Sequence, residues 1–394
     1  MTCTGVVGGQ WRATITEWGA VEPWDDSPTI DWFIAADDRW HRPQHETSTR
    51  QTKLDGTPVV ETRVRIPSGD AVCRVYSVAD GGGLTIFEVI NESTLPMAVA
   101  FTGGGLLARR PPSSIAPQGI ELPNDAVVYP IGHHATVVVA RAHDASVAAL
   151  PERVPSAEQV ARGWLTQTQR ASRLRLPDPA MVDAVTSARC ELLLNGPSTD
   201  DEDPVALLLG IAELVRLGHQ PAIWVPDVAA ALERLARSGA QIPDGVIGAV
   251  GRVLHGAGEQ RALEDLRRLS LATRTEGQQD ELPASIGYVP FGVERRLVMS
   301  DDYRAKLMPS GFPPAWLGVD FEAHGLAIGL ASTLSFAIRW HGERPAVLWD
   351  VTGAPMSLSY ERWSTSQLSG EALWDGSSVA ASPTEMRPGS STVA

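Results

Sequence analysis

A change of pattern near residue 150 is the feature that most constrains how this chain of 394 residues can fold. Before it, short stretches rich in Val, Ile, Thr and aromatic residues alternate with clusters of Gly, Pro, Asn and Asp, a pattern that predicts β-strands and turns. After it, longer stretches carry apolar residues at helical spacing. A chain of this length suits two or three domains rather than one, so we expect each pattern to mark its own domain.

The first pattern predicts an antiparallel β-sandwich over residues 1–150. Strand-like stretches at 59–66, 71–79, 84–91, 97–102 and 135–143 follow one another at roughly the spacing expected for such a fold. In residues 60–66 the even positions are Val, Thr, Val and Ile, and the odd positions are Glu, Arg and Arg. This alternation predicts a strand with one buried face and one face in water.

The second pattern predicts a helical domain over residues 151–280. Ser156 with Gln159 forms a capping-box signature, and Asp-Pro pairs at 178–179 and 203–204 are typical of helix starts. In the first helix, Val160, Trp164, Thr168 and Ala171 recur at helical spacing. About six helices joined by short loops favour antiparallel hairpins. We expect them in the following stretches: 156–171, 178–196, 203–218, 226–239, 244–258 and 259–275.

A third region returns to strands. The stretches 332–342, 344–353 and 356–360 predict a small C-terminal β unit over residues 281–375. Residues 376–394 are small, polar and contain Pro, which predicts a flexible tail. The expected fold class is therefore a multidomain α+β protein: a β-sandwich, a central α-hairpin domain and a small C-terminal β unit.

Charge argues against two classes of partner. The formal net charge is −14, and the chain has only two lysines, whereas nucleic-acid binding depends on clustered basic residues. The sequence also has no polybasic patch and no apolar run of ~18 residues, so no membrane association is expected.

The start of the chain lacks an apolar signal segment, and the three cysteines are far apart. These features predict a cytoplasmic protein.

No motif predicts a cofactor or a metal. The chain contains no phosphate-binding Gly-Lys-Ser/Thr loop and no His-Glu-x-x-His helix. The glycine runs at 81–83 and 103–105 lie between predicted strands, whereas a dinucleotide fingerprint requires a strand that leads directly into a helix. We therefore expect no cofactor and no metal site.

Tryptophan is unusually frequent in this chain. There are 12 tryptophans, and five of them fall within the first 40 residues. A half-exposed indole offers a flat apolar face with a polar edge, which suits stacking against a sugar ring. The tripeptide Arg-Trp-His occurs at 39–41 and again at 339–341. We therefore predict Trp40, His41, Trp340 and His341 as substrate-binding residues, although core or inter-domain packing is the alternative for each tryptophan.

Two adjacent acids precede the first of these tripeptides. Asp37 and Asp38 are the candidate catalytic residues, since a pair of carboxylates with different pKa values can perform acid/base chemistry. Adjacent residues of a strand point to opposite faces, so such a dyad needs a more distant partner. The alternative is an ion-paired turn, in which Arg39 and His41 hold these acids at the end of a strand.

A helix glutamate is a further candidate acid. Glu213 lies within the stretch 203–218, on a helix whose composition predicts a core-facing position. The alternative is a structural ion pair with Arg216, which follows it three residues later on the same helix face.

The order of these regions resembles a known enzyme family. An N-terminal sandwich, a linker that enters a helix with "RGWL" at 162–165, and antiparallel helical hairpins resemble the layout of glucoamylase-like glycosidases with an α/α barrel. The resemblance covers about residues 1–275. It implies carboxylate chemistry on an α-linked glucan or disaccharide. The family barrel has twelve helices, whereas about six are expected here, so no catalytic residue is transferred.

Three functions remain open on this reading. The first is a glycoside hydrolase-like enzyme acting on an α-glucan or oligosaccharide. The second is a non-catalytic carbohydrate-binding or scaffold protein with half a barrel, which works as a homo-oligomer or with a partner protein. The third is a structural interaction protein whose tryptophans all serve packing.

Overall fold

The structure, a computed structural model, describes most of the chain and divides it into two compact units. The described residues are 1–115, 117–144, 147, 149–198, 203–239, 242–273, 288–301 and 303–374. The first unit comprises Met1–Arg170 and Asp183–Pro197, and the second comprises Ala171–Val182 and the chain from Ser198 onward. The predicted tail at 376–394 and the predicted boundary at 280 lie outside the described residues.

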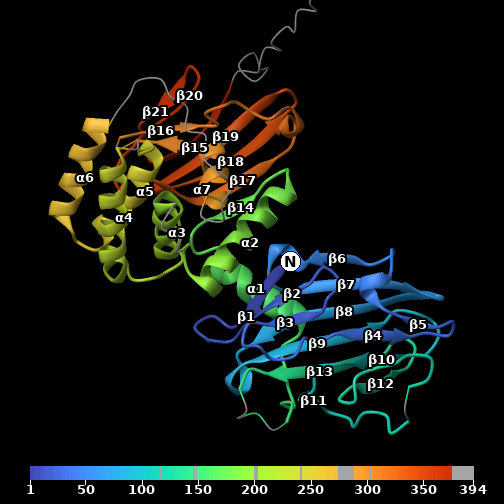
Figure 1. The fold of residues 1–394 in the computed structure, drawn as a ribbon. Helices are drawn as coiled ribbons and strands as arrows, with labels where there is room; N and C mark the ends of the chain where they lie inside the picture. Colours follow the sequence, from blue (N-terminus) through green and yellow to red (C-terminus); the bar gives the residue numbers. More distant parts are fainter. Residues whose placement is uncertain are drawn as a thin grey trace, which may run out of the picture. The chain divides into compact units, whose positions relative to one another are not determined.

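The first unit contains three antiparallel sheets (Figure 1). A three-stranded sheet consists of β1 (Thr2–Gly5), β2 (Arg12–Ile15) and β3 (Val21–Pro23). A four-stranded sheet has the order β12 (Val127–Ile131), β10 (Met97–Phe101), β4 (Trp32–Ala35) and β5 (Trp40–His41). A six-stranded sheet has the order β11 (Leu106–Ala108), β13 (Thr136–Ala142), β9 (Leu84–Asn91), β8 (Gly69–Val78), β7 (Val60–Ile66) and β6 (Arg50–Lys53).

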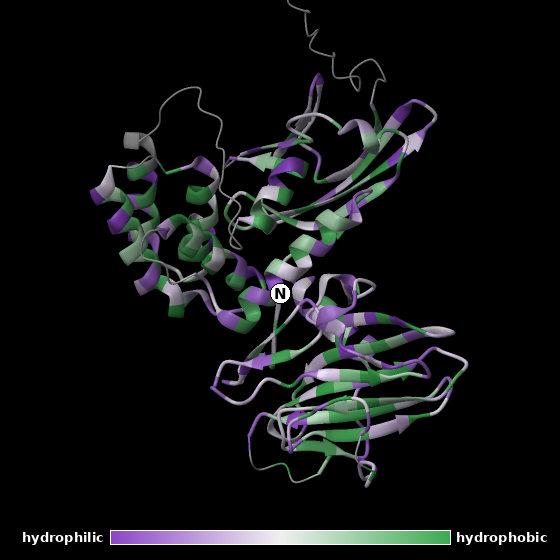
Figure 2. Ribbon diagram, turned by 45° about the vertical axis from the view of Figure 1, so that its right-hand side comes forward, coloured by the Kyte–Doolittle hydropathy of each residue, from purple (hydrophilic) through white to green (hydrophobic). Residues whose placement is uncertain are grey.

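One hydrophobic core joins the four-stranded and six-stranded sheets. Trp32 of β4 and Phe101 of β10 belong to the same buried cluster as Val64 of β7 and Phe87 of β9. Two antiparallel sheets that share a core in this way fit the predicted β-sandwich. Figure 2 shows the corresponding green, hydrophobic stretches along the strands.

The outer face of the six-stranded sheet is partly covered by a helix. Helix α1 (Ala157–Thr168) packs against β8, and its Ala157 and Ala161 share a second buried cluster with Tyr76. The prediction that the odd positions of residues 60–66 face water is therefore wrong in part, because Glu61 is only 9% exposed. Its carboxylate is bound by Arg74, at 2.8 Å, and a second nitrogen of Arg74 lies 2.7 Å from Glu158 of α1.

Helix α2 (Pro179–Asn195) begins in the second unit and ends in the first. The capping box predicted at Ser156 and Gln159 is present at the start of α1. Because α1 and most of α2 belong to the first unit, the prediction of one domain of six hairpin-joined helices is not confirmed. The mixed α+β class is confirmed, with seven α-helices among the described residues.

The second unit combines the remaining helices with two sheets (Figure 1). Its helices are α3 (Pro204–Arg216), α4 (Val225–Ser238), α5 (Asp244–Gly256), α6 (Gln260–Thr273) and α7 (Val289–Leu297). The five-stranded sheet has the order β14 (Arg173–Arg175), β17 (Phe321–Ile328), β18 (Ser332–His341), β19 (Arg344–Thr352) and β22 (Ser369–Leu373). The four-stranded sheet has the order β15 (Val298–Ser300), β16 (Arg304–Leu307), β20 (Ser357–Tyr360) and β21 (Trp363–Thr365).

Sequence signals explain the packing of this unit locally. The carboxylate of Asp203 accepts a hydrogen bond from the backbone N–H of Ala206 and caps α3, as the Asp-Pro pair predicts. Helices α3 to α6 bury one shared apolar cluster. The strands β18 and β19 pair antiparallel across a tight turn, with His341 opposite Arg344. Glu213 forms the predicted ion pair with Arg216, at 2.8 Å.

Candidate functional site

The stretch of residues 33–42 forms a hairpin at the edge of the four-stranded sheet. β4 pairs with β5 so that Ile34 lies opposite His41 and Ala35 lies opposite Trp40. The backbone N–H of Ala36 donates to the carbonyl of Arg39 at 3.0 Å and closes the turn. A short 3₁₀ helix, η1 (Pro43–His45), follows β5 at once. The polar residues on both sides of β5 are therefore held close to one another.

Asp37 and Asp38 are exposed residues of this turn. Asp38 Oδ1 lies 3.0 Å from Nε2 of the buried His41, and this hydrogen bond lowers the pKa of Asp38. A general acid needs the opposite shift, because it must hold its proton near neutral pH. The geometry around Asp38 matches that of an ion-paired turn.

His41 is enclosed between two carboxylates. While Nε2 faces Asp38, Nδ1 lies 3.2 Å from Oε1 of Glu46. Only 4% of the His41 side chain is exposed, so its ring is a support for the site rather than part of its surface. The sequence predicted His41 as a binding residue, but this buried side chain is not among the residues that line the neighbouring pocket.

Glu46 and Arg39 form a two-point ion pair on the pocket wall. Nη1 and Nη2 of Arg39 donate to the two carboxylate oxygens of Glu46 at 2.6 and 3.0 Å. The hydrogen bond from Arg39 lowers the pKa of Glu46, so this carboxylate is ionised near neutral pH. Arg39 thus fixes the orientation of both carboxylate oxygens of Glu46.

Trp40 is half-buried, and its ring is held by a distant loop. The indole N–H donates to the carbonyl of Gln118 at 2.6 Å. The next residue, Gly119, has φ +77°, and a Cβ placed there would lie 3.6 Å from Cδ1 of the Trp40 ring. The loop therefore approaches the ring closely and fixes its orientation.

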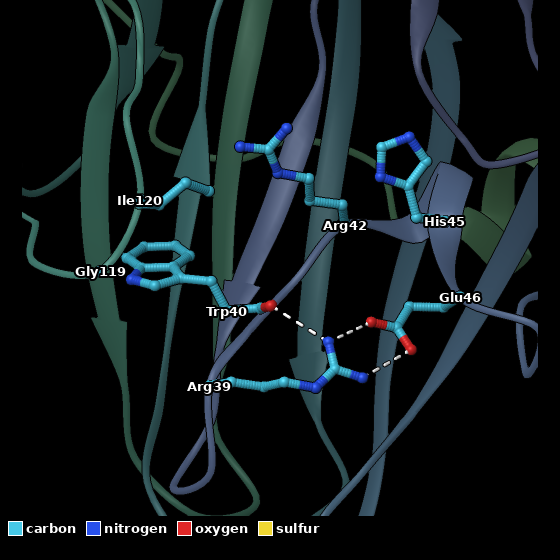
Figure 3. A pocket seen from close by; sticks show the side chains of 7 residues that line it. All are labelled: Arg39, Trp40, Arg42, His45, Glu46, Gly119 and Ile120. Carbon is cyan, nitrogen blue, oxygen red and sulfur yellow. Dashed lines mark hydrogen bonds and ion pairs between the residues drawn. The ribbon is translucent and has the colours of Figure 1, made fainter.

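These residues line a pocket of about 250 Å³ (Figure 3). Figure 3 shows Trp40 and Ile120 along one side and His45 and Glu46 along the other. The pair of Arg39 and Glu46 closes one end, and Arg42 lies at the other. The lining residues are Arg39, Trp40, Arg42, His45, Glu46, Gly119 and Ile120. An apolar wall thus faces a polar wall across a space for one small ligand group.

Trp340 and His341, the second predicted pair, lie in the second unit at the end of β18. The Trp340 ring contacts Phe312, with 5.6 Å between ring centroids, and belongs to an aromatic cluster of that unit. His341 is exposed beside the turn to β19. The pocket of the first unit contains neither residue, so the repeated tripeptide marks two hairpins in two different environments.

Sequence reasoning missed most of the pocket. Arg42, His45 and Glu46 follow Trp40 directly, and their density of polar groups after a short strand was the available signal. Gly119 and Ile120 are far away in the sequence, and no local pattern connects them with Trp40.

No protein-family model matches the sequence, no curated protein matches it, and no solved structure matches the fold. Within the described ranges, no group of three or more His, Cys, Asp or Glu residues is placed to hold a metal ion. None of the helices described combines the length and the apolar character that crossing a membrane requires.

Proposed function

We propose that the first unit binds a carbohydrate in the Trp40 pocket. The observation that carries this proposal is the indole of Trp40, which is fixed by Gln118 and faces a polar wall across a small space. A sugar ring presents C–H groups on one face and hydroxyl groups around its edge. The indole face suits the C–H groups, and the carboxylate of Glu46 and the ring of His45 suit the hydroxyls.

The size of the pocket supports a small ligand group. Sites for drug-sized ligands measure roughly 300–1,000 Å³. At about 250 Å³, the Trp40 pocket is suited to a single sugar ring, free or at the end of a longer chain. The two-point bond between Arg39 and Glu46 holds the acceptor oxygens in place before binding, so little side-chain entropy is lost.

The test compares two tryptophans of the same unit. A thermal-shift screen with monosaccharides and disaccharides identifies a ligand, since a ligand that binds only the folded state raises the melting temperature. Trp40→Ala should weaken binding of that sugar at least about tenfold. Trp24→Ala is the matched control, because Trp24 is 55% exposed and lies outside the pocket lining. Equal effects of both substitutions, or a screen without any stabilising sugar, would contradict the proposal.

Glycoside hydrolysis, as the resemblance to glucoamylase-like enzymes implies, is the second candidate. It is favoured by Asp31, whose pKa is raised by burial against the opposing effects of the hydrogen bond from the Trp32 backbone and the charges of Arg42 and His45. Asp31 lies outside the residues that line the pocket, but its pKa and that of Glu46 are shifted in opposite directions, as in acid/base pairs. Asp31→Asn should then abolish turnover of a bound glycoside while leaving its affinity unchanged. Binding without turnover in the unmodified protein would exclude this candidate.

A further inference from the structure

Arg42 differs from the other arginine of the pocket in having unused donors. Among the described residues, its guanidinium makes no hydrogen bond and no ion pair, and its carbon Cζ lies 5.9 Å from the ring centre of Phe33. Arg39, in contrast, directs both terminal nitrogens at Glu46. Figure 3 shows the two guanidinium groups at opposite ends of the pocket. A bound ligand therefore meets, at the Arg42 end, guanidinium N–H groups that make no hydrogen bond among the described residues.

We propose that the sugar bound in the Trp40 pocket carries one carboxylate, as a uronic acid does, and that the guanidinium of Arg42 binds this carboxylate. The inference rests on the proposed carbohydrate function. A planar guanidinium matches a carboxylate through two parallel N–H···O bonds, which are roughly twice as strong as neutral hydrogen bonds. The indole face of Trp40 then stacks on the sugar ring, while the guanidinium of Arg42 binds the carboxylate of the sugar.

A single negative charge fits the pocket better than a double one. The opposite charges of Arg39 and Glu46 offset each other, so Arg42 adds one excess positive charge to the pocket lining, which a singly charged carboxylate balances. A phosphate group carries about two charges at neutral pH, whereas a carboxylate carries one. The net charge of −14 on the whole chain disfavours each further negative charge on a ligand.

The experiment titrates the full chain with matched pairs of sugars by calorimetry. Glucuronate is compared with glucose, galacturonate with galactose, and glucose 6-phosphate serves as the doubly charged probe. We expect each uronate to bind about tenfold or more tightly than its neutral partner, with the difference shrinking as salt is added. Arg42→Gln should remove this difference by weakening the binding of each uronate to about the level of its neutral partner. Arg65→Gln is the control, because Arg65 is 66% exposed and lies outside the pocket lining.

The possible outcomes separate this inference from the proposed function. Neutral sugars that bind as tightly as uronates, and lose affinity in Trp40→Ala, overturn the inference while the carbohydrate function stands. Tighter binding of glucose 6-phosphate than of glucuronate also overturns it. If no sugar binds, both proposals fail. Because Arg42 is exposed and makes no hydrogen bond within the described residues, Arg42→Gln is expected to fold, which an unchanged melting temperature verifies.

Discussion

Nε2 of His41 lies 3.0 Å from Oδ1 of Asp38, so the buried ring anchors an exposed carboxylate of the turn before β5. We predict that Asp38→Asn lowers stability by less than about 1 kcal/mol, because the Asp38 side chain is 44% exposed and water screens the pair. Sugar binding should be unchanged, since Asp38 does not line the pocket. Denaturant unfolding and titration with the ligand measure the two effects. A loss of turnover in a variant that remains folded would instead support a catalytic Asp38.

Gly56 is pressed against helix α2. Its φ is +71°, and a Cβ there would lie 2.8 Å from Cα of Asp183 and closer still to its carbonyl oxygen. The Gly56 carbonyl also accepts a hydrogen bond from Ser187 at 2.6 Å. We predict that Gly56→Ala destabilises the first unit by about 2 kcal/mol more than Gly8→Ala does. Urea unfolding followed by tryptophan fluorescence gives the comparison.

Gly8 is a matched control for this substitution. Its φ is +76°, so alanine meets a similar backbone strain, but no atom lies within 4 Å of the added Cβ. The strain by itself costs roughly 1 kcal/mol at either site. Equal losses at both positions would show that α2 does not press on Gly56.

Arg216 bridges two buried carboxylates in the second unit. Nη1 lies 2.8 Å from Glu213, and Nη2 lies 2.9 Å from Glu294. Arg216→Met should cost about 3–5 kcal/mol, because it leaves two buried charges without this cation. Arg268→Met, which breaks an exposed pair with Asp265, should cost less than about 0.5 kcal/mol. Similar urea midpoints for the two variants would contradict the structural role of the buried pair.

Local signals in the sequence predicted local structure well. Ser156 and Gln159 lie three residues apart, and both halves of their capping box depend only on that spacing. In the helix that follows, Trp164 and Thr168 are buried as predicted. Ala171 is not on this helix, because α1 ends at Thr168. Periodicity identified the buried stripe but not the last turn.

Long-range packing was beyond these signals. The alternation in residues 60–66 identified the inner face, yet Glu61 is buried because α1 lies over the outer face. The pocket shows the same limit. Trp40, His45 and Glu46 come from one short stretch of sequence, whereas Ile120, which lies beside Trp40, comes from a distant loop. That loop is held by the hydrogen bond from Trp40 to Gln118, 78 residues away. The arrangement of the whole sheet determines which distant loop packs against the Trp40 ring. A short stretch of sequence is therefore not enough to predict this contact.

His143 is a titratable residue of the first unit whose ring is packed against other side chains. Its Nε2 lies 2.9 Å from Oγ1 of Thr85, and its ring stacks on Trp11 with 4.1 Å between ring centroids. Burial lowers the pKa of His143 to about 4, and the charge of Arg12 acts in the same direction. The folded state therefore holds this imidazole in its neutral form.

We predict that His143 makes the first unit less stable as pH falls from 6.5 to about 4. The imidazole of the unfolded chain has the ordinary pKa of 6.5 and takes up a proton first, so its contribution is complete above that pH and is lost below it. The total change is up to about 3 kcal/mol. His143→Gln keeps a polar group near Thr85 but does not titrate, so its urea midpoint should vary less over this range. Equal pH dependence in variant and unmodified protein would show that other groups are responsible.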